Sequence, residues 1–253
     1  MEGWNVSECL QKVFRQIEEA KLKRTDDLQG REVRLLAVSK IKPVEYIIQA
    51  YNAGQKHFGE NYVQELHDKA TDPKLLEHCK DIKWHLIGHL QSNKVNKVLS
   101  VPNLWMIESI DSIKLATQIN KAWPNYGLPD SKLDVMIQVN TSRETVKSGC
   151  ETSELTELAR HILNECPNLR LDGLMTIGKY GYDPTLGPNP DYVCLRKCRD
   201  DLCDALNLDS KEINLSMGMS NDFEQAIELG STHVRVGQTI FGERPDKAMW
   251  KKD

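Results

Sequence analysis

The chain has 253 residues, and 33 Lys and Arg against 37 Asp and Glu give it a formal net charge of −4. This slightly acidic balance argues against a protein whose main work is to bind nucleic acid or anionic lipid. Hydrophobic residues form 40% of the chain, yet the longest apolar runs have only the length of a strand, which argues against a membrane protein. We therefore expect a globular protein with neither a nucleic acid nor a membrane as partner.

The N-terminus and the cysteines both indicate an intracellular location. The first residues lack the basic region and the apolar stretch of a secretory signal. The seven cysteines are an odd number and include no C-x-x-C pair, so the sequence predicts neither a zinc ribbon nor a thioredoxin-like motif. We expect a cytoplasmic protein, and the sequence is compatible with an additional mitochondrial fraction.

The predicted elements alternate between short apolar strands and helices along the whole chain. Apolar residues at helical spacing predict an amphipathic leading helix over about residues 7–23. A nearly continuous apolar run over 34–40 predicts a first strand, and a helix over 44–53 follows Pro43 and ends at Gly54. The further strands are predicted over 56–60, 82–87, 104–109, 133–140, 171–177, 213–217 and 233–236. The helices between them are predicted over 63–70, 92–99, 112–122, 152–165, 191–206 and 222–229.

Eight strands with helices between them predict parallel pairing and right-handed crossovers. Eight such units in 253 residues fit a TIM (β/α)8 barrel over about 34–244, with the whole chain, 1–253, as a single domain. An open doubly wound sheet is the alternative, but it would normally carry a glycine-rich turn after its first strand. The turn here is Ser39-Lys-Ile-Lys-Pro43, and no G-x-G-x-x-G motif occurs in the chain.

Barrel enzymes place their functional groups at the carboxyl ends of the strands. The first strand ends on Lys40, whose stem would lie in an apolar barrel mouth, where partial desolvation favours the neutral amine that imine formation requires. The same position suits a lysine that merely extends to solvent. His85 and His89 straddle the end of the third strand with Gly88 between them, so no metal site is expected there.

Small residues after the seventh and eighth strands indicate a phosphate site. The seventh strand ends in Ser216-Met-Gly-Met-Ser220, and the eighth in Arg235-Val-Gly-Gln-Thr239. Such segments let backbone N–H groups approach a phosphate, although Ser220 would also suit a helix N-cap. A phosphate site and a lysine together predict a phosphorylated carbonyl compound held as an imine. Pyridoxal phosphate and the phosphosugar of an aldolase both fit.

The motifs at the strand ends also carry a family resemblance. The chain closely resembles the pyridoxal phosphate homeostasis protein family, in the family's order and from about Leu35 to Arg244. The motifs are Ala37-Val-Ser-Lys40, Phe58-Gly-Glu-Asn-Tyr-Val-Gln-Glu65, Trp84-His-Leu-Ile-Gly-His-Leu-Gln91, Gly173-Leu-Met-Thr-Ile-Gly178, Leu215-Ser-Met-Gly-Met-Ser220 and Arg235-Val-Gly followed by Ile240-Phe-Gly242. The stretch from Tyr180 to Asp191 resembles the animal branch.

The resemblance implies a modified TIM barrel of the fold-type III kind, like the alanine racemase N-terminal domain, with pyridoxal 5'-phosphate at the strand ends. It implies that Lys40 forms the internal aldimine and that Arg235 faces the pyridine nitrogen. It assigns the phosphate to Ser216, Gly218, Ser220, Gly237 and Gln238, and the walls of the ring site to Asn61, His85, Met175 and Thr176. Relatives usually carry Thr or Ser where this chain has Gln238, a change that a backbone contact would survive.

The resemblance implies a protein that is not an enzyme and has no catalytic residue. It would buffer pyridoxal phosphate in vitamin B6 homeostasis, with apo-enzymes that use the cofactor as its recipients. Arg235 supports this hypothesis, because an arginine donates to the ring nitrogen without protonating it. The alternative is an amino-acid racemase of the alanine-racemase type, which needs a second base from an extra β domain. The short tail after Glu243-Arg-Pro245 leaves no room for that domain. A Schiff-base aldolase is a third, less favoured possibility.

Overall fold

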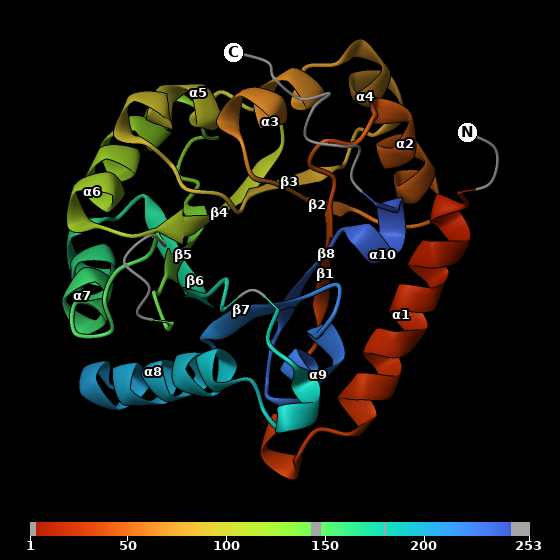
Figure 1. The fold of residues 1–253 in the computed structure, drawn as a ribbon. Coiled ribbons are helices and arrows are strands. Elements are labelled where there is room, and N and C mark those ends of the chain that lie inside the picture. The colour runs from red at the N-terminus through yellow and green to blue at the C-terminus, as the bar shows by residue number, and fades with distance from the viewer. Residues whose placement is uncertain (1–3, 143–147, 180, 244–253) are drawn as a thin grey trace.

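The structure is a computed structural model that describes residues 4–142, 148–179 and 181–243. Within these residues, eight parallel strands pair in chain order and close into a barrel (Figure 1). The strands are β1 Arg34–Val38, β2 His57–Glu60, β3 Lys83–Leu86, β4 Leu104–Ile110, β5 Leu133–Gln138, β6 Leu169–Met175, β7 Asn214–Met219 and β8 His233–Val236. Every predicted strand is confirmed, with ends that agree within two residues. The predicted barrel is therefore correct, and the open sheet is wrong.

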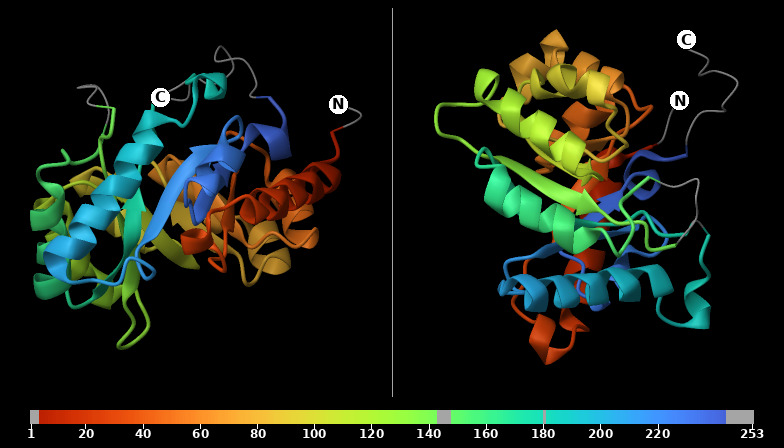
Figure 2. Two further views of the ribbon diagram at one scale, coloured as in Figure 1. Left: turned by 90° about the horizontal axis from the view of Figure 1, so that it is seen from below. Right: turned by 90° about the vertical axis from the view of Figure 1, so that its left-hand side faces the viewer.

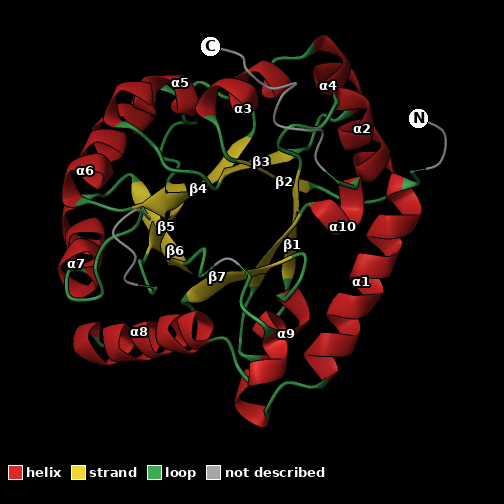
Figure 3. Ribbon diagram, in the orientation of Figure 1, coloured by secondary structure: helices red, strands yellow, loops and turns green. Residues whose placement is uncertain are grey.

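Helices surround the ring of strands on all sides (Figure 3). They are α1 Val6–Leu22, α2 Val44–Asn52, α3 Val63–Ala70, α4 Pro73–His78, α5 Val95–Leu99, α6 Ile113–Ala122, α7 Leu155–Glu165, α8 Pro190–Leu206, α9 Phe223–Glu228 and α10 Gln238–Phe241. Short 3-10 turns occupy Asp26–Leu28, Ser92–Lys94, Trp123–Asn125 and Pro184–Leu186. Throughout the described ranges, none of these helices combines the length and apolar character that a membrane crossing requires.

The leading helix was predicted correctly and has a structural role. α1 runs along the outside of the barrel against α2, α9 and α10 (Figures 1 and 2). Its buried face carries Leu10, Val13 and Ile17 at helical spacing. Two short helices, α4 and α10, were not predicted, because each has too few residues to show a periodic pattern. The predicted barrel end at residue 244 and the tail after it lie outside the described residues.

Side chains of the strands alternate between two environments. Leu35 and Ala37 join the large apolar cluster between strands and helices, whereas Leu36 and Val38 form a separate cluster with Ile87. A third cluster holds Met106, Met136 and Met175 from three adjacent strands. Because successive side chains of a strand point to opposite faces, the two small clusters lie inside the barrel. Leu36 and Val38, four and two residues before Lys40, therefore present apolar side chains to the barrel interior.

Candidate functional site

The loop after β1 holds Lys40 at the carboxyl end of the barrel. Lys40 is half-buried, and Ile41 directly after it has a φ of +64°. A β-branched residue in this left-handed region is strained, and such strain persists only where neighbouring contacts hold it. Here the backbone N–H of Ile41 donates to Glu65 Oε1 at 2.6 Å, and Lys42 Nζ donates to the carbonyl oxygens of Phe241 and Gly242 at 2.9 Å. The loop is thus fixed by contacts of the two residues that directly follow Lys40.

A buried polar cluster on the outer face of β1 and β2 supports this loop. Lys69 Nζ contacts Ser39 O at 2.6 Å and the carboxylates of Glu60 and Glu65 at 2.7 Å each. The Ser39 hydroxyl donates to Glu60 Oε1 at 2.6 Å. Burial raises the pKa of Glu60 to about 7, although Lys69 opposes that shift. The ammonium of Lys69 thus links the start of the β1–α2 loop, at Ser39, to the carboxylates of Glu60 and Glu65.

The strand register places the ends of β1, β2 and β8 side by side. Val38 pairs with Gly59, and Ala37 pairs with Val236, so Lys40, Asn61 and Gly237 follow adjacent strands. A Cβ at Gly237 would lie 3.0 Å from Val38 O, which explains a glycine at this close approach. The N–H of Gly237 donates to Ser220 Oγ at 3.2 Å. Lys40, Asn61, Ser220, Gly237 and the adjoining Gln238 therefore share the barrel mouth.

The structure shows why a glycine stands at position 218 and tests the alternative role of Ser220 as a helix N-cap. Gly218 has a φ of +98°, and a Cβ there would lie 2.6 Å from Ala226 Cβ in α9, so only glycine allows this helix to pack against β7. The N-cap of α9 is Asp222, not Ser220, which corrects the alternative reading of that serine. Asp222 accepts from the backbone N–H of Met219 at 2.8 Å.

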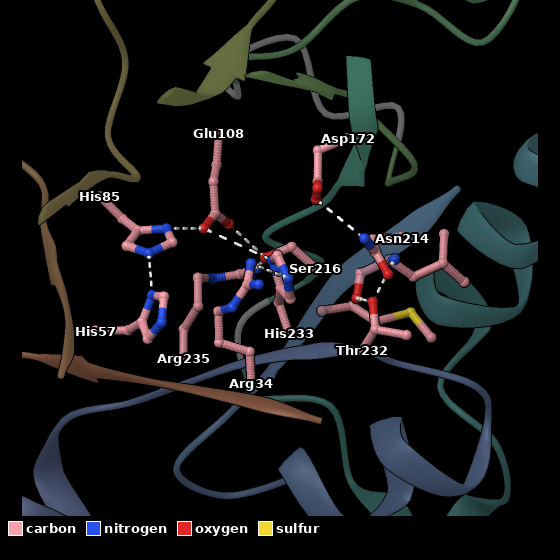
Figure 4. A network of polar contacts seen from close by, with 12 residues as sticks. Arg34, His57, His85, Glu108, Asp172, Asn214, Ser216, Thr232, His233 and Arg235 are labelled. Carbon is pink, nitrogen blue, oxygen red and sulfur yellow. Dashed lines mark hydrogen bonds and ion pairs between the residues drawn. The ribbon is translucent and has the colours of Figure 1, made fainter. Parts of the chain in front are cut away.

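Three of the remaining predicted residues, His85, Ser216 and Arg235, belong to one network of polar contacts (Figure 4). Arg235 donates from Nη1 to Ser216 Oγ at 2.6 Å and from Nη2 to Thr176 O at 2.7 Å. His85 is fully buried, and its two ring nitrogens contact His57 of β2 and Glu108 of β4. The last predicted residue, Met175, packs in the apolar cluster already described. The structure thus brings Arg235, Ser216 and Thr176 into contact and places His85 on β3 and Met175 on β6, with two strands between them.

Several functional candidates of the interior were missed by the sequence reasoning. Glu108 on β4 accepts from Ser216 at 2.6 Å and contacts His85 Nδ1 at 2.9 Å, and both of its oxygens are buried. His233 on β8 is bonded to Arg34 at 2.8 Å. A signal was available for the glutamate, since it is a charged residue within the apolar run Leu104-Trp-Met-Ile-Glu-Ser-Ile110.

Two observations test whether the site fits pyridoxal phosphate. Asn61 Oδ1 is buried and has no hydrogen-bond partner among the described residues, so a donor from a bound group would satisfy it. Arg235 uses two of its five N–H bonds in the contacts above, which leaves donors for a ring nitrogen. The described residues contain no cluster of three or more His, Cys, Asp or Glu side chains suited to a metal. The residues present fit the cofactor that the resemblance implied.

Comparisons with known proteins decide the family. Residues 19–245 match the family described as alanine racemase, N-terminal domain. The chain is 51% identical over 236 residues to the pyridoxal phosphate homeostasis protein of Homo sapiens, covering 93% of this chain and 86% of that protein. The protein of the same name from Caenorhabditis elegans is 45% identical over 86% of this chain and 88% of its own length. This chain belongs to the pyridoxal phosphate homeostasis protein family.

Solved structures agree with this membership. PipY of Synechococcus elongatus with pyridoxal phosphate bound is 29% identical, with a TM-score of 0.77 over 94% of this chain and all of PipY. An alanine racemase of Clostridium difficile shares the fold at 14% identity, with a TM-score of 0.65 over 96% of this chain and 59% of the racemase. The predicted fold-type III barrel of the alanine-racemase kind is therefore confirmed.

Proposed function

We propose that this chain binds pyridoxal 5'-phosphate through a Schiff base on Lys40 and acts in vitamin B6 homeostasis. The observation that carries the proposal is the placement of Lys40 on a strained loop beside the ends of β2 and β8. Contacts of Ser39 hold this loop before Lys40, and contacts of Ile41 and Lys42 hold it after Lys40. The family membership supports it, because the curated relatives are named for pyridoxal phosphate homeostasis. When bound, the cofactor supplies an aldehyde that condenses with amines and a ring that acts as an electron sink.

Residues at the barrel mouth and residues of the barrel interior would bind different parts of the cofactor. We propose that Ser220 and the backbone of Gly237 and Gln238 hold the phosphate at the mouth. The N–H of Gly237, which bonds to Ser220 Oγ in the structure, would then donate to the phosphate together with the N–H of Gln238. In this arrangement Gly218 shapes the turn, and Ser216 contributes through Arg235, because its single hydroxyl proton already goes to Glu108. Asn61, His85, Met175 and Thr176 would form the walls, and the whole chain would be one domain.

Arg235 favours a carrier over a catalyst. An arginine beside the ring nitrogen donates a hydrogen bond but keeps its proton, so the ring stays a weak stabiliser of carbanions. We therefore propose a protein that buffers or delivers the cofactor and is not an enzyme, with apo-enzymes as recipients. All seven cysteines lie in the described ranges and are free thiols. Free thiols agree with a cytoplasmic location and also with a mitochondrial fraction.

Borohydride trapping tests the proposal. The purified protein should show the absorbance of an imine, and reduction should attach the cofactor covalently to Lys40, as mapped by peptide mass spectrometry. Lys40→Ala should abolish the attachment. Lys74→Ala is the matched control, because its ammonium lies at the surface, where it pairs with Glu45, and this variant should still be trapped. Attachment at another lysine, or none, would refute the cofactor assignment.

Two further measurements address the class of function. Conversion of L- to D-alanine that disappears in Lys40→Ala would overturn the proposal of a carrier and favour the racemase. Transfer of the cofactor to an apo-enzyme faster than its release into solution would support active delivery. A transfer rate equal to the release rate would support buffering alone.

A further inference from the structure

A chain of buried hydrogen bonds crosses the barrel interior from β8 to β2. It runs from Arg235 through the Ser216 hydroxyl and the Glu108 carboxylate to His85 and then to His57 (Figure 4). Its four links measure 2.6, 2.6, 2.9 and 2.8 Å. None of these contacts is needed to close the barrel, because the backbone ladders do that. A TIM barrel interior is ordinarily filled with branched apolar side chains, so a polar chain here calls for a reason.

The direction of these hydrogen bonds is determined by counting protons. A serine hydroxyl has one proton, and Ser216 gives it to Glu108 Oε2, so its oxygen lone pairs face the guanidinium of Arg235. This orientation requires an ionised Glu108, since a protonated carboxyl could donate to Ser216 and reverse the bond. Burial alone would raise the pKa of Glu108, but the hydrogen bond from His85 and the nearby positive groups lower it to about 2.

Glu108 is also the main compensating charge for Arg235. Within the described residues, no carboxylate lies within 4.0 Å of the Arg235 guanidinium, and burial lowers its pKa while the charge of Glu108 opposes that shift most strongly. The titratable or charged side chains that face Glu108 are His85 from β3 and His233 and Arg235 from β8. Asp172 from β6 also interacts with it, since the charge of Glu108 is one of the causes that raise the pKa of Asp172 to about 6. A buried cation without its counter-charge is strongly disfavoured.

We infer that Glu108 is a positioning residue that acts through Ser216 to fix Arg235 as the permanent cation facing the ring nitrogen of the cofactor. The inference rests on the proposed function, and it explains why a glutamate is buried in the middle of β4. Glu108 holds the acceptor that orients Nη1, while Thr176 O holds Nη2. These two contacts fix the plane of the Arg235 guanidinium, and so they determine the direction of its remaining N–H bonds.

The test is a pH titration of the absorbance of the bound cofactor. In Glu108→Gln, loss of the negative charge leaves the charge of Arg235 less compensated, which disfavours further positive charge at the cofactor. The midpoint of the absorbance change should fall by about one pH unit, and cofactor affinity should fall about tenfold. Ser216→Ala should weaken affinity similarly, and the double variant should be no weaker than the weaker single variant, because the two residues act in series.

The matched control is Glu224→Gln. Glu224 is a half-buried carboxylate of α9 that accepts from Gln16 of α1 at 2.7 Å, on the outside of the barrel, so the midpoint should stay at the wild-type value. A Glu108→Gln protein that melts earlier but keeps the wild-type midpoint would overturn the inference, because it would show a purely structural role. Additive losses of affinity in the double variant would also overturn it.

Failure of this inference can be distinguished from a variant that does not fold and from failure of the proposed function. If Glu108→Gln does not fold, Ser216→Ala decides the matter, and unchanged affinity in that variant overturns the inference. If the wild-type protein binds no cofactor at Lys40, the proposed function itself fails, and borohydride trapping shows this before any variant is made.

Discussion

The two faces of the barrel strands lie in environments of opposite character. Outward-facing residues such as Phe58 and Trp84 join one large apolar cluster between strands and helices. The inner face holds two small apolar clusters, and between them runs the hydrogen-bonded chain that contains Glu108 and Arg235. The outer layer therefore stabilises the fold by removing apolar surface from water. The inner face instead holds a few charged groups in fixed positions.

This difference shows how one set of strands can serve two purposes. Alternation along a strand lets each residue be chosen for one face independently of the next. The separation is incomplete, because Lys69, Glu60 and Glu65 form a polar cluster in the outer layer beside the loop that carries Lys40. This cluster lies where a strained loop needs support, so near the candidate site polar groups are found on both faces of the strands.

The largest expected effect comes from breaking the outer layer. Trp84 is fully buried, and its ring centroid lies 6.0 Å from that of Phe58. Trp84→Ala should lower the free energy of unfolding by about 3–5 kcal/mol, measured by urea denaturation. Leu163→Ala, at a leucine of α7 that is 45% exposed, should change it by less than about 0.5 kcal/mol. Equal losses in both variants would contradict the division between the layers.

The polar cluster of the outer layer should be the next most sensitive. Lys69→Met leaves Glu60 buried without its cation, which should cost about 3 kcal/mol of unfolding free energy. A second substitution, Glu60→Gln, should restore part of that loss, because the uncompensated charge is then gone. Lys74→Met removes an exposed pair with Glu45 and should cost less than about 1 kcal/mol. If both lysine variants behave alike, the buried cluster does not support the loop.

A smaller effect is expected from pH at the inner face. Burial lowers the pKa of His233 from 6.5 to about 3. Between these values the unfolded chain binds a proton that the folded chain does not, so stability falls as pH decreases below 6.5. The loss should reach roughly 2 kcal/mol at pH 5. His233→Asn should reduce the pH dependence of unfolding by this amount, since the buried His57, whose pKa is lowered to about 2, keeps its own contribution, while His78→Asn, at a side chain 54% exposed, should leave it unchanged. A wild-type slope in His233→Asn would refute the assignment.

Much of the fold could be predicted because the outer layer leaves a regular pattern. Buried strands such as Arg34–Val38 read as short apolar runs, and the helices show apolar residues at helical spacing. The pattern was too short to show α4 and α10. The comparisons then confirmed the family that six motifs in order had suggested.

The candidate site could be predicted only in part. Lys40, Gly237 and Ser220 follow strands, so the topology of a barrel was enough to bring them to one mouth. The role of Ser216 could not be read in this way. A serine at the end of a strand suits a phosphate, but its hydroxyl proton is given to Glu108, a residue 108 positions away in the chain. The individual assignments stay predictions until the cofactor is trapped.

The sequence by itself determined the order of strands and helices, the parallel barrel and the lysine at its mouth, because each depends on local periodicity and on known topological rules. Only the tertiary structure decided which polar groups meet inside the barrel. The contact of Ser216 with Glu108 joins β7 to β4 across 108 positions of the chain, and such partners are selected by strand register and by the closure of the barrel. A hydrogen bond depends on distance and direction in space, and neither is encoded in the spacing of residues along the chain.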